Sequence, residues 1–258
     1  MRSSLEIQYS VIRALFLREA ITRISSGRVA WLWLIIEPIT HLIFIIVLLG
    51  VFLKRAIPGA EPILFIATGL VGFFMFSRVY SMCKGAISSN LALFSYRQVK
   101  PVDTIFARAL VECFIFMLSV VVLFTGLALF GFNVLPAYPL QFMLAIFAMW
   151  LTGLGLGLLL SLAHELTPNF ANILDLFLKP LYFLSAVMYP VATIPEPYRG
   201  YLLYNPLVHG IESIRQGFFP FYRPLPEINL GYLFVFALVF IFFGLILHSR
   251  YSQRLMTA

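Results

Sequence analysis

The chain has 258 residues and carries few charges, with 18 Lys or Arg against 11 Asp or Glu; charged residues make up 11 % of it, whereas soluble domains average about 25 %. Hydrophobic residues make up 61 % and aromatic residues 16 %. A soluble fold of this size cannot bury so much apolar side chain, and its surface would aggregate. The composition therefore indicates a polytopic membrane protein and argues against a cytosolic enzyme and against a disordered chain.

The net charge is +7 and the sequence pI is about 9.6. In a soluble protein this charge would suggest nucleic acid as a partner. In a membrane protein, cytoplasmic loops that face anionic lipid explain it, so we expect no nucleic-acid partner. The two cysteines, Cys83 and Cys113, form no metal-ligand spacing and no disulfide framework. We therefore expect no metal site.

The N-terminal segment, residues 5–26, has the pattern of one helix. Ile7, Val11 and Leu15 share a broad apolar face, and Arg13 and Arg23 lie opposite. We expect an amphipathic interface helix on the inner membrane surface, within a cytoplasmic segment of residues 1–28. The first long apolar run begins only at about residue 29, after these arginines, so we expect no cleavable signal peptide.

A spanning helix needs about 20 mostly apolar residues, and the rest of the chain contains six such stretches. They cover approximately residues 31–53, 63–82, 104–130, 140–163, 170–189 and 228–247. The prediction is a single all-α transmembrane domain with a six-span core over residues 29–247 and a cytoplasmic tail over residues 248–258. If the spans alternate, eleven of the 18 Lys and Arg residues fall on the side of the termini. This bias predicts that both termini are cytoplasmic.

The longest interruption between spans, residues 191–227, is itself apolar and is divided into short pieces by prolines, among them Pro195, Pro197, Pro206 and Pro220. It predicts two short helices on the outer side, at about residues 197–204 and 206–216, which dip into the membrane. Irregular backbone at that depth is tolerated only where protein or water surrounds it. A plain interfacial loop is the alternative.

Charges inside a membrane are costly and need a reason, and the fifth span holds the clearest pattern. Asp175, Lys179, Tyr182 and Tyr189 share one face at helical spacing, and Asp175 precedes Lys179 in the order that favours an ion pair. This face either lines a wet conduit or forms a self-neutralised pair near the inner interface.

Two other spans add candidate conduit residues. Glu37 and His41 share a face of the first span, where Pro38 either kinks the helix or marks its start, and Glu37 could simply cap that start. A proton relay through this pair is a further alternative. The second span carries Arg78 and presents three rings that could stack on sugar faces or face lipid: Phe73, Phe76 and Tyr80.

The chain contains no phosphate-binding Gly-Lys-Ser/Thr loop, no zinc-protease motif and no Gly-x-Ser-x-Gly nucleophile motif. A transporter of this composition must draw its energy from an ion gradient or from a separate ATPase. We expect this chain to be a permease subunit without enzymatic activity of its own.

Four stretches, taken together in their order, resemble a known family. They are EPITHL (37–42), NLALFSYRQVKPVDT (90–104), LKPLYF followed by MYP (178–190) and YNPLVH (204–209). The sequence is similar from about residue 10 onward to the permease subunits of capsular polysaccharide ABC exporters, within the type-2 (ABC-2-type) exporters.

The resemblance implies a homodimer of permeases in the bacterial inner membrane, paired with two copies of an ABC ATPase that binds ATP and Mg. No cofactor would bind to this chain. The implied substrate is a lipid-linked, usually acidic capsular polysaccharide. The further implied partners are a periplasmic co-polymerase-type adaptor and an outer-membrane export channel.

The resemblance also implies a coupling helix after the second span, at about residues 88–98. The ATPase-contacting residues would be Asn90, Leu93, Phe94, Tyr96 and Arg97. Basic groups, among them Arg78, Lys84, Arg97 and Lys179, would offset the negative charge of the substrate.

Other functions remain open. A type-2 permease for O-antigen, teichoic acid or another lipophilic substrate would share the coupling features. An ion-coupled secondary transporter would use Glu37, His41, Asp175 and Lys179. An intramembrane enzyme acting on a lipid-linked sugar is the third alternative.

Overall fold

The computed structural model describes residues 4–25, 30–52 and 57–257, apart from some side chains near helix ends and in the first half of the second helix. Within these residues the chain is helical, with turns and one isolated bridge between Ile57 and Ala60. The helices are α1 (Ser4–Ser25), α2 (Ala30–Phe52), α3 (Pro62–Lys84), η1 (Ser88–Ser95), α4 (Pro101–Leu129), α5 (Pro139–Leu166), α6 (Pro168–Leu178), α7 (Leu181–Leu184), η2 (Val191–Thr193), α8 (Tyr198–Leu202), α9 (Pro206–Phe218) and α10 (Leu230–Thr257).

Proline sets the start of many of these helices, because its fixed φ suits the first turn and its missing N–H group needs no partner there. Helices α3, α4, α5, α6 and α9 all begin with proline. Two starts have a side-chain cap as well. The backbone N–H of Lys100 donates to Asp103 Oδ2 at 2.9 Å, and Asn205 Oδ1 accepts from the N–H of Leu207 at 3.0 Å.

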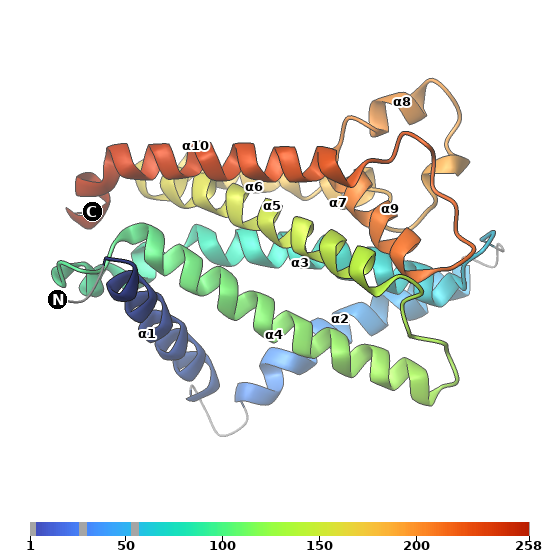
Figure 1. The fold of residues 1–258 in the computed structure, drawn as a ribbon, viewed down its shortest axis with the longest axis horizontal. Helices are drawn as coiled ribbons and strands as arrows, with labels where there is room; N and C mark the ends of the chain where they lie inside the picture. The colour runs from blue at the N-terminus through green and yellow to red at the C-terminus, as the bar shows by residue number, and fades with distance from the viewer. Residues whose placement is uncertain (1–3, 26–29, 53–56, 258) are drawn as a thin grey trace.

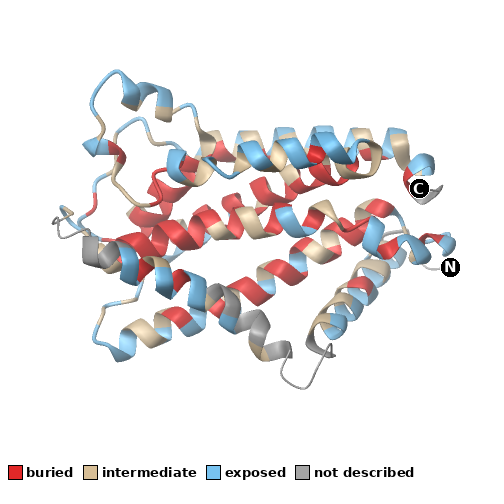
Figure 2. Ribbon diagram, turned by 180° about the vertical axis from the view of Figure 1, so that it is seen from behind, coloured by how far each residue is buried: buried red, intermediate tan, exposed pale blue. Residues whose placement is uncertain are grey.

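The four long helices α3, α4, α5 and α10 run along the length of the bundle (Figure 1). Helix α5 lies between α3 and α10, while α4 and α2 pack on the other side of α3, and α1 crosses α4. We call the two ends of the bundle the η1 end, where α1 begins and α10 finishes, and the α9 end, which carries α8 and α9. Buried residues concentrate along the central helices, and the outer surface of α10 is largely exposed (Figure 2).

Glycines of α5 bring its backbone close to both neighbours. A Cβ atom at Gly153 would lie 2.7 Å from the carbonyl oxygen of Phe76 in α3, and one at Gly157 would lie 2.6 Å from Cβ of Cys83. A Cβ atom at Gly155 would lie 2.7 Å from Cβ of Phe240 in α10. The glycine spacing in this span therefore serves packing within the chain, as small residues do between membrane helices.

Four of the expected spans are confirmed as helices that are long and apolar enough to cross a membrane: α3, α4, α5 and α10 up to Leu255. Helix α2 occupies the first expected span, and its described side chains include an apolar stretch at Ile39–Leu48. It begins at Ala30, so Pro38 does not mark its start.

The fifth expected span is wrong as one continuous helix. The chain forms α6, breaks at Lys179 and Pro180, forms the single turn α7, and then reverses at Ala186 with φ of 56°. Pro180 has no N–H group to donate to the preceding turn, and this interrupts the helix. Helix α10 continues into the predicted tail and buries His248 against Ser161; the cytoplasmic location of residues 248–258 stays a prediction.

The two short helices expected on the outer side are present as α8 and α9. Helix α9 is buried along almost its whole length, against α3, α5 and α10. Its C-terminal end is joined to the start of α5 by backbone hydrogen bonds from Ala137 to Phe218 (3.0 Å) and from Tyr138 to Gly217 (2.8 Å). Protein thus surrounds this segment, which favours the inserted helix over a plain surface loop.

Candidate translocation and coupling sites

Two open cavities adjoin each other along α3. The first, of about 280 Å³, lies between α2, α3 and the broken α6–α7 segment; the predicted conduit residues on its wall are His41, Phe73, Tyr80, Lys179 and Tyr182. The second, of about 340 Å³, shares His41 and Tyr80 and adds Arg78, Ser77 and Ser81. The structure therefore brings together six of the predicted conduit residues, from three separate spans.

Aromatic rings and unused polar groups give these cavities their chemical character. The ring of Tyr182 meets that of Phe73 edge-on at 5.1 Å, and His41 meets Phe74 at 5.0 Å. The hydroxyl of Tyr182 is buried and has no hydrogen-bond partner in the described part of the chain. The ammonium group of Lys179 belongs to an exposed residue at the helix break. The cavities thus offer ring edges, a hydroxyl and cations to a ligand.

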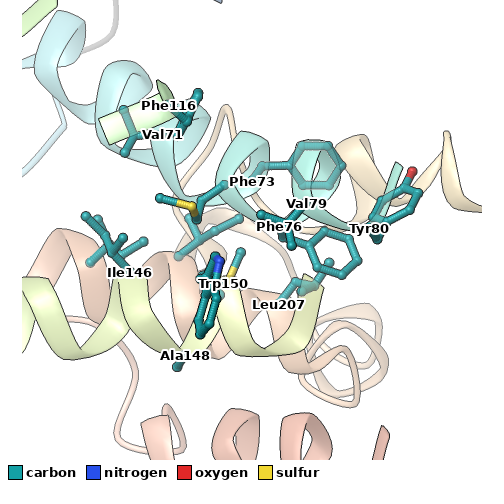
Figure 3. Close-up of a cluster of buried hydrophobic side chains, with 14 of the residues drawn as sticks. Val71, Phe73, Phe76, Val79, Tyr80, Phe116, Ile146, Ala148, Trp150 and Leu207 are labelled. Carbon is teal, nitrogen blue, oxygen red and sulfur yellow. The ribbon is translucent and has the colours of Figure 1, made fainter. Parts of the chain in front are cut away.

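Four predicted conduit residues lie elsewhere. Phe76 is buried in the core, and its ring contacts those of Phe73 and Tyr80 (Figure 3). Tyr189 lies in the loop after α7 and donates its hydroxyl to the carbonyl oxygen of Phe183 at 2.7 Å. Asp175 lines neither cavity. The side chain of Glu37 lies outside the described residues.

The ion pair between Asp175 and Lys179, one of the two alternatives for this face, is not formed. Asp175 pairs instead with Lys84 at the end of α3, which ties α6 to α3. Helix α6 ends at Leu178, so Asp175 lies within the helix and Lys179 lies just after its end. Lys179 is exposed and remains available to a ligand.

A buried carboxylate in α4, which the sequence analysis did not select, organises the η1 end. Glu112 is fully buried and accepts a hydrogen bond from Arg23 of α1 at 2.6 Å and from Arg78 of α3 at 2.7 Å. Nearby, Glu19 of α1 pairs with Arg108 of α4 at 2.9 Å. The sequence does point to Glu112, because it is a single acidic residue inside an apolar run and a buried carboxylate in a membrane needs a partner.

The predicted coupling segment forms η1 and the turn after it. Tyr96 and Arg97 are exposed, and Leu93 is half-buried on the wall of a 450 Å³ cavity shared with α1. Phe94 is buried, and buried Asn90 accepts from Arg18 of α1 at 2.7 Å and donates to the carbonyl of Ala86. Thus Asn90 and Phe94 hold the segment on the bundle, whereas Tyr96 and Arg97 face away from it.

A second buried ion pair, which was not predicted from the sequence either, lies within α9. Arg215 donates to Glu212 at 2.8 Å and to the carbonyl oxygens of Ala186 (2.8 Å) and Val187 (2.6 Å). Its guanidinium carbon lies 3.5 Å from the ring centre of Phe65. Tyr222 donates to the other oxygen of Glu212 at 2.7 Å.

Burial, together with the negative charge of Glu212, raises the pKa of the Tyr222 hydroxyl, so Tyr222 stays protonated and continues to donate. The cluster clamps the reversal after α7 onto the buried α9. In the sequence it is visible only as a Glu and an Arg three residues apart.

The bundle, its inserted α9 and the segment between α3 and α4 define a membrane-transport permease, and comparison with known proteins agrees. The chain matches the family model described as ABC-2 type transporter over residues 10–219. It belongs to that family.

Individual relatives align over nearly the whole chain. The chain is 38 % identical over 257 residues to the polysialic acid transport protein KpsM of Escherichia coli, covering 100 % of this chain and 99 % of that protein. It is 32 % identical to the capsule polysaccharide export inner-membrane protein CtrC of Neisseria meningitidis, covering 97 % and 94 %. It is 29 % identical to the capsule polysaccharide export inner-membrane protein BexB of Haemophilus influenzae, covering 98 % and 95 %.

Proposed function

We propose that this chain is the transmembrane subunit of an ATP-driven exporter that moves lipid-linked, acidic capsular polysaccharide across the bacterial inner membrane. The observation that carries the proposal is the end-to-end alignment with KpsM, CtrC and BexB, whose names all refer to polysialic acid or capsule polysaccharide transport.

The proposed assembly follows the family. Two copies of this chain pair with two copies of a separate ABC ATPase that binds ATP and Mg, and this chain holds no cofactor. Six passes cross the membrane, with α6 and α7 as a broken fifth pass, and both termini are cytoplasmic. The exposed apolar side chains of α6, among them Phe170, Ile173 and Phe177, need a cover of lipid or of the second copy.

Beyond the membrane, the proposed partners are a periplasmic co-polymerase-type adaptor and an outer-membrane export channel. The cavities along α3 support an acidic polymer as substrate. Arg78 and Lys179 bring positive charge to their walls, and Phe73, Tyr80 and Tyr182 bring rings. Rings and dispersed cations give weak contacts that a moving polymer can exchange one by one.

A gene deletion tests the substrate. Cells without this chain should lose surface capsule, keep normal lipopolysaccharide and accumulate the lipid-linked polymer inside. Re-expression together with the ATPase should restore export, and a protonophore should not block transport in inverted vesicles supplied with ATP. Loss of O-antigen instead of capsule, or transport that needs no ATPase, would reject the proposal in favour of the alternatives.

For ATPase docking, the exposed part of the predicted coupling segment is the best candidate. Tyr96→Ala and Arg97→Ala should lower the ATPase activity that the permease stimulates, and each variant should still fold, since both side chains face away from the bundle. Arg13→Ala, at an exposed arginine of α1, is the matched control. Normal stimulation in both η1-end variants would rule out this docking surface.

A further inference from the structure

One carboxylate joins three helices at the η1 end. Glu112 of α4 has no exposed side-chain surface, and its two oxygens accept from different helices: Oε2 from Arg23 of α1 (2.6 Å) and Oε1 from Arg78 of α3 (2.7 Å). Since a buried carboxylate is strongly destabilising without its partners, these contacts constrain all three helices.

The two arginines lead to different parts of the molecule. Arg78 lies on the wall of the 340 Å³ cavity, beside His41 and Tyr80. Arg23 lies in the last turn of α1, and α1 also holds the coupling segment through the hydrogen bond from Arg18 to Asn90 at 2.7 Å. Helix α1 therefore links η1, held through Arg18, to Glu112, held through Arg23, and Glu112 in turn binds Arg78 at the cavity.

We propose that Glu112 is a positioning residue that couples movement of α1 and η1 to the place of Arg78 in the cavity wall. The inference rests on the proposed transport function and deepens it. An anionic substrate in the cavity attracts Arg78, and displacement of α1 moves Arg23. Either event changes how strongly the other arginine binds Glu112.

The burial of the three side chains makes this exchange feasible. The arginines keep 16 % and 19 % of their side-chain surface exposed, while Glu112 keeps 0 %. Arg78 borders the cavity and Arg23 also pairs with Glu19 at 3.3 Å, so each arginine has an alternative to Glu112, but Glu112 must always retain one of them. Because linkage is reciprocal, the free energy with which substrate binding biases the position of α1 must equal the free energy with which the position of α1 biases substrate binding.

The neighbouring Glu19 provides the matched control. It is also an acidic residue of this network, pairing with Arg23 at 3.3 Å and with Arg108 at 2.9 Å. Among the described residues it forms no ion pair or hydrogen bond with Arg78, and it lies on neither cavity wall. A purely structural role for the network predicts similar effects for Glu19→Gln and Glu112→Gln.

The first experiment measures polymer exported per ATP hydrolysed by the permease–ATPase complex in proteoliposomes. Glu112→Gln should lower this ratio about tenfold, within the range typical of coupling between sites, and Glu19→Gln should lower it less than twofold. Arg23→Gln should reproduce the loss although Arg23 lies far along the contact chain from the ligand. If Glu112→Gln does not assemble, Arg23→Gln and Arg78→Gln, alone and combined, replace it, and coupling requires that their effects be non-additive.

The second experiment measures position directly. Spin labels at Tyr9→Cys on α1 and Met82→Cys on α3, with Cys83 and Cys113 replaced by Ala, report the distance between the two helices. Both label sites are exposed. ATP trapping should change this distance in the otherwise wild-type complex, because α1 moves while Arg23 and Arg78 exchange their shares of Glu112. Polymer substrate should shift the distance as well, and in Glu112→Gln it should no longer do so, because Arg78 is then uncoupled from α1.

The outcomes separate the two proposals. If the wild-type complex exports no polysaccharide, the proposed function fails. If it exports, but Glu112→Gln keeps the wild-type ratio and the wild-type distances, the function stands and the coupling role of Glu112 is wrong.

Discussion

The two ends of the bundle each bury a glutamate against arginine, but they do so in different ways. At the α9 end, Glu212 and Arg215 lie on the same helix, and Arg215 is also bound to two backbone carbonyls. At the η1 end, Glu112 is shared between side chains from two other helices, and its arginines reach solvent.

We call the Glu212–Arg215 cluster the fixed joint and the cluster around Glu112 the adjustable joint. Backbone carbonyls at Ala186 and Val187 cannot be exchanged without unfolding the reversal after α7, so the α9 end should remain rigid. Side-chain contacts between helices can be exchanged one at a time, so the η1 end can change shape while every buried charge keeps a partner.

The largest expected effect follows from breaking the fixed joint. Arg215→Met leaves Glu212 buried without its cation and leaves two carbonyls unpaired, which should cost about 3–5 kcal/mol of stability. Thermal unfolding of the detergent-solubilised protein measures the loss. Arg223→Met, at an exposed arginine in the next loop, should leave the unfolding midpoint unchanged. If Arg215→Met unfolds at the wild-type midpoint, the contacts of Arg215 with Glu212 and the two carbonyls contribute nothing to stability.

A close backbone contact offers a second way to break the same end. A Cβ atom at Gly69 of α3 would lie 2.4 Å from the carbonyl oxygen of Val187 and 2.6 Å from Arg215 Nη2, so Gly69→Ala should cost about 1–3 kcal/mol. Gly85, at the other end of the same helix, has nothing within 4 Å of such an atom. Gly85→Ala should therefore unfold at the wild-type temperature, and similar losses in both variants would contradict the rigid α9 end.

The adjustable joint should be less costly to disturb. Glu112→Gln keeps the shape of the side chain and removes its charge, while both arginines can turn toward water. We expect a loss of about 1–2 kcal/mol, well below that of Arg215→Met in the same thermal assay. A loss as large as that of Arg215→Met would erase the distinction between the two ends.

The smallest effect is expected between α3 and α6. Lys84 and Asp175 keep 19 % and 28 % of their side-chain surface exposed, so Lys84→Met should cost less than about 1 kcal/mol. The difference from the wild type should shrink in high salt, because mobile ions screen an exposed pair. Unfolding midpoints at low and high salt measure it, and a salt-independent loss of several degrees would show that the pair acts as a buried one.

The apolar length of a segment predicted much of this fold from the sequence. Helices α3, α4, α5 and α10 follow from it, and the prolines of residues 191–227 predicted α8 and α9. Apolar length failed at residues 170–189, because Pro180 interrupts the helix although the segment remains apolar on both sides.

The choice of ionic partners was harder to predict. Spacing within one helix suggested Lys179 for Asp175, but Lys84 lies 91 positions away in the chain and meets Asp175 only because the fold brings the end of α3 beside α6. Glu112 was missed for the same reason, since both of its partners come from other helices. In contrast, His41, Phe73, Tyr80, Lys179 and Tyr182 meet around one cavity as their helical faces suggested. Their roles in transport remain predictions.

The glycines of α5 have a mechanical consequence. Gly153 and Gly157 press its backbone onto α3, and Gly155 presses it onto α10. Rotation of α5 about its own axis would push larger side chains into α3 or α10. We therefore expect α3, α5 and α10 to move together as one rigid unit. Any widening of a path for a polymer must then come from α2 and the interrupted α6–α7 segment, which border the cavity along α3.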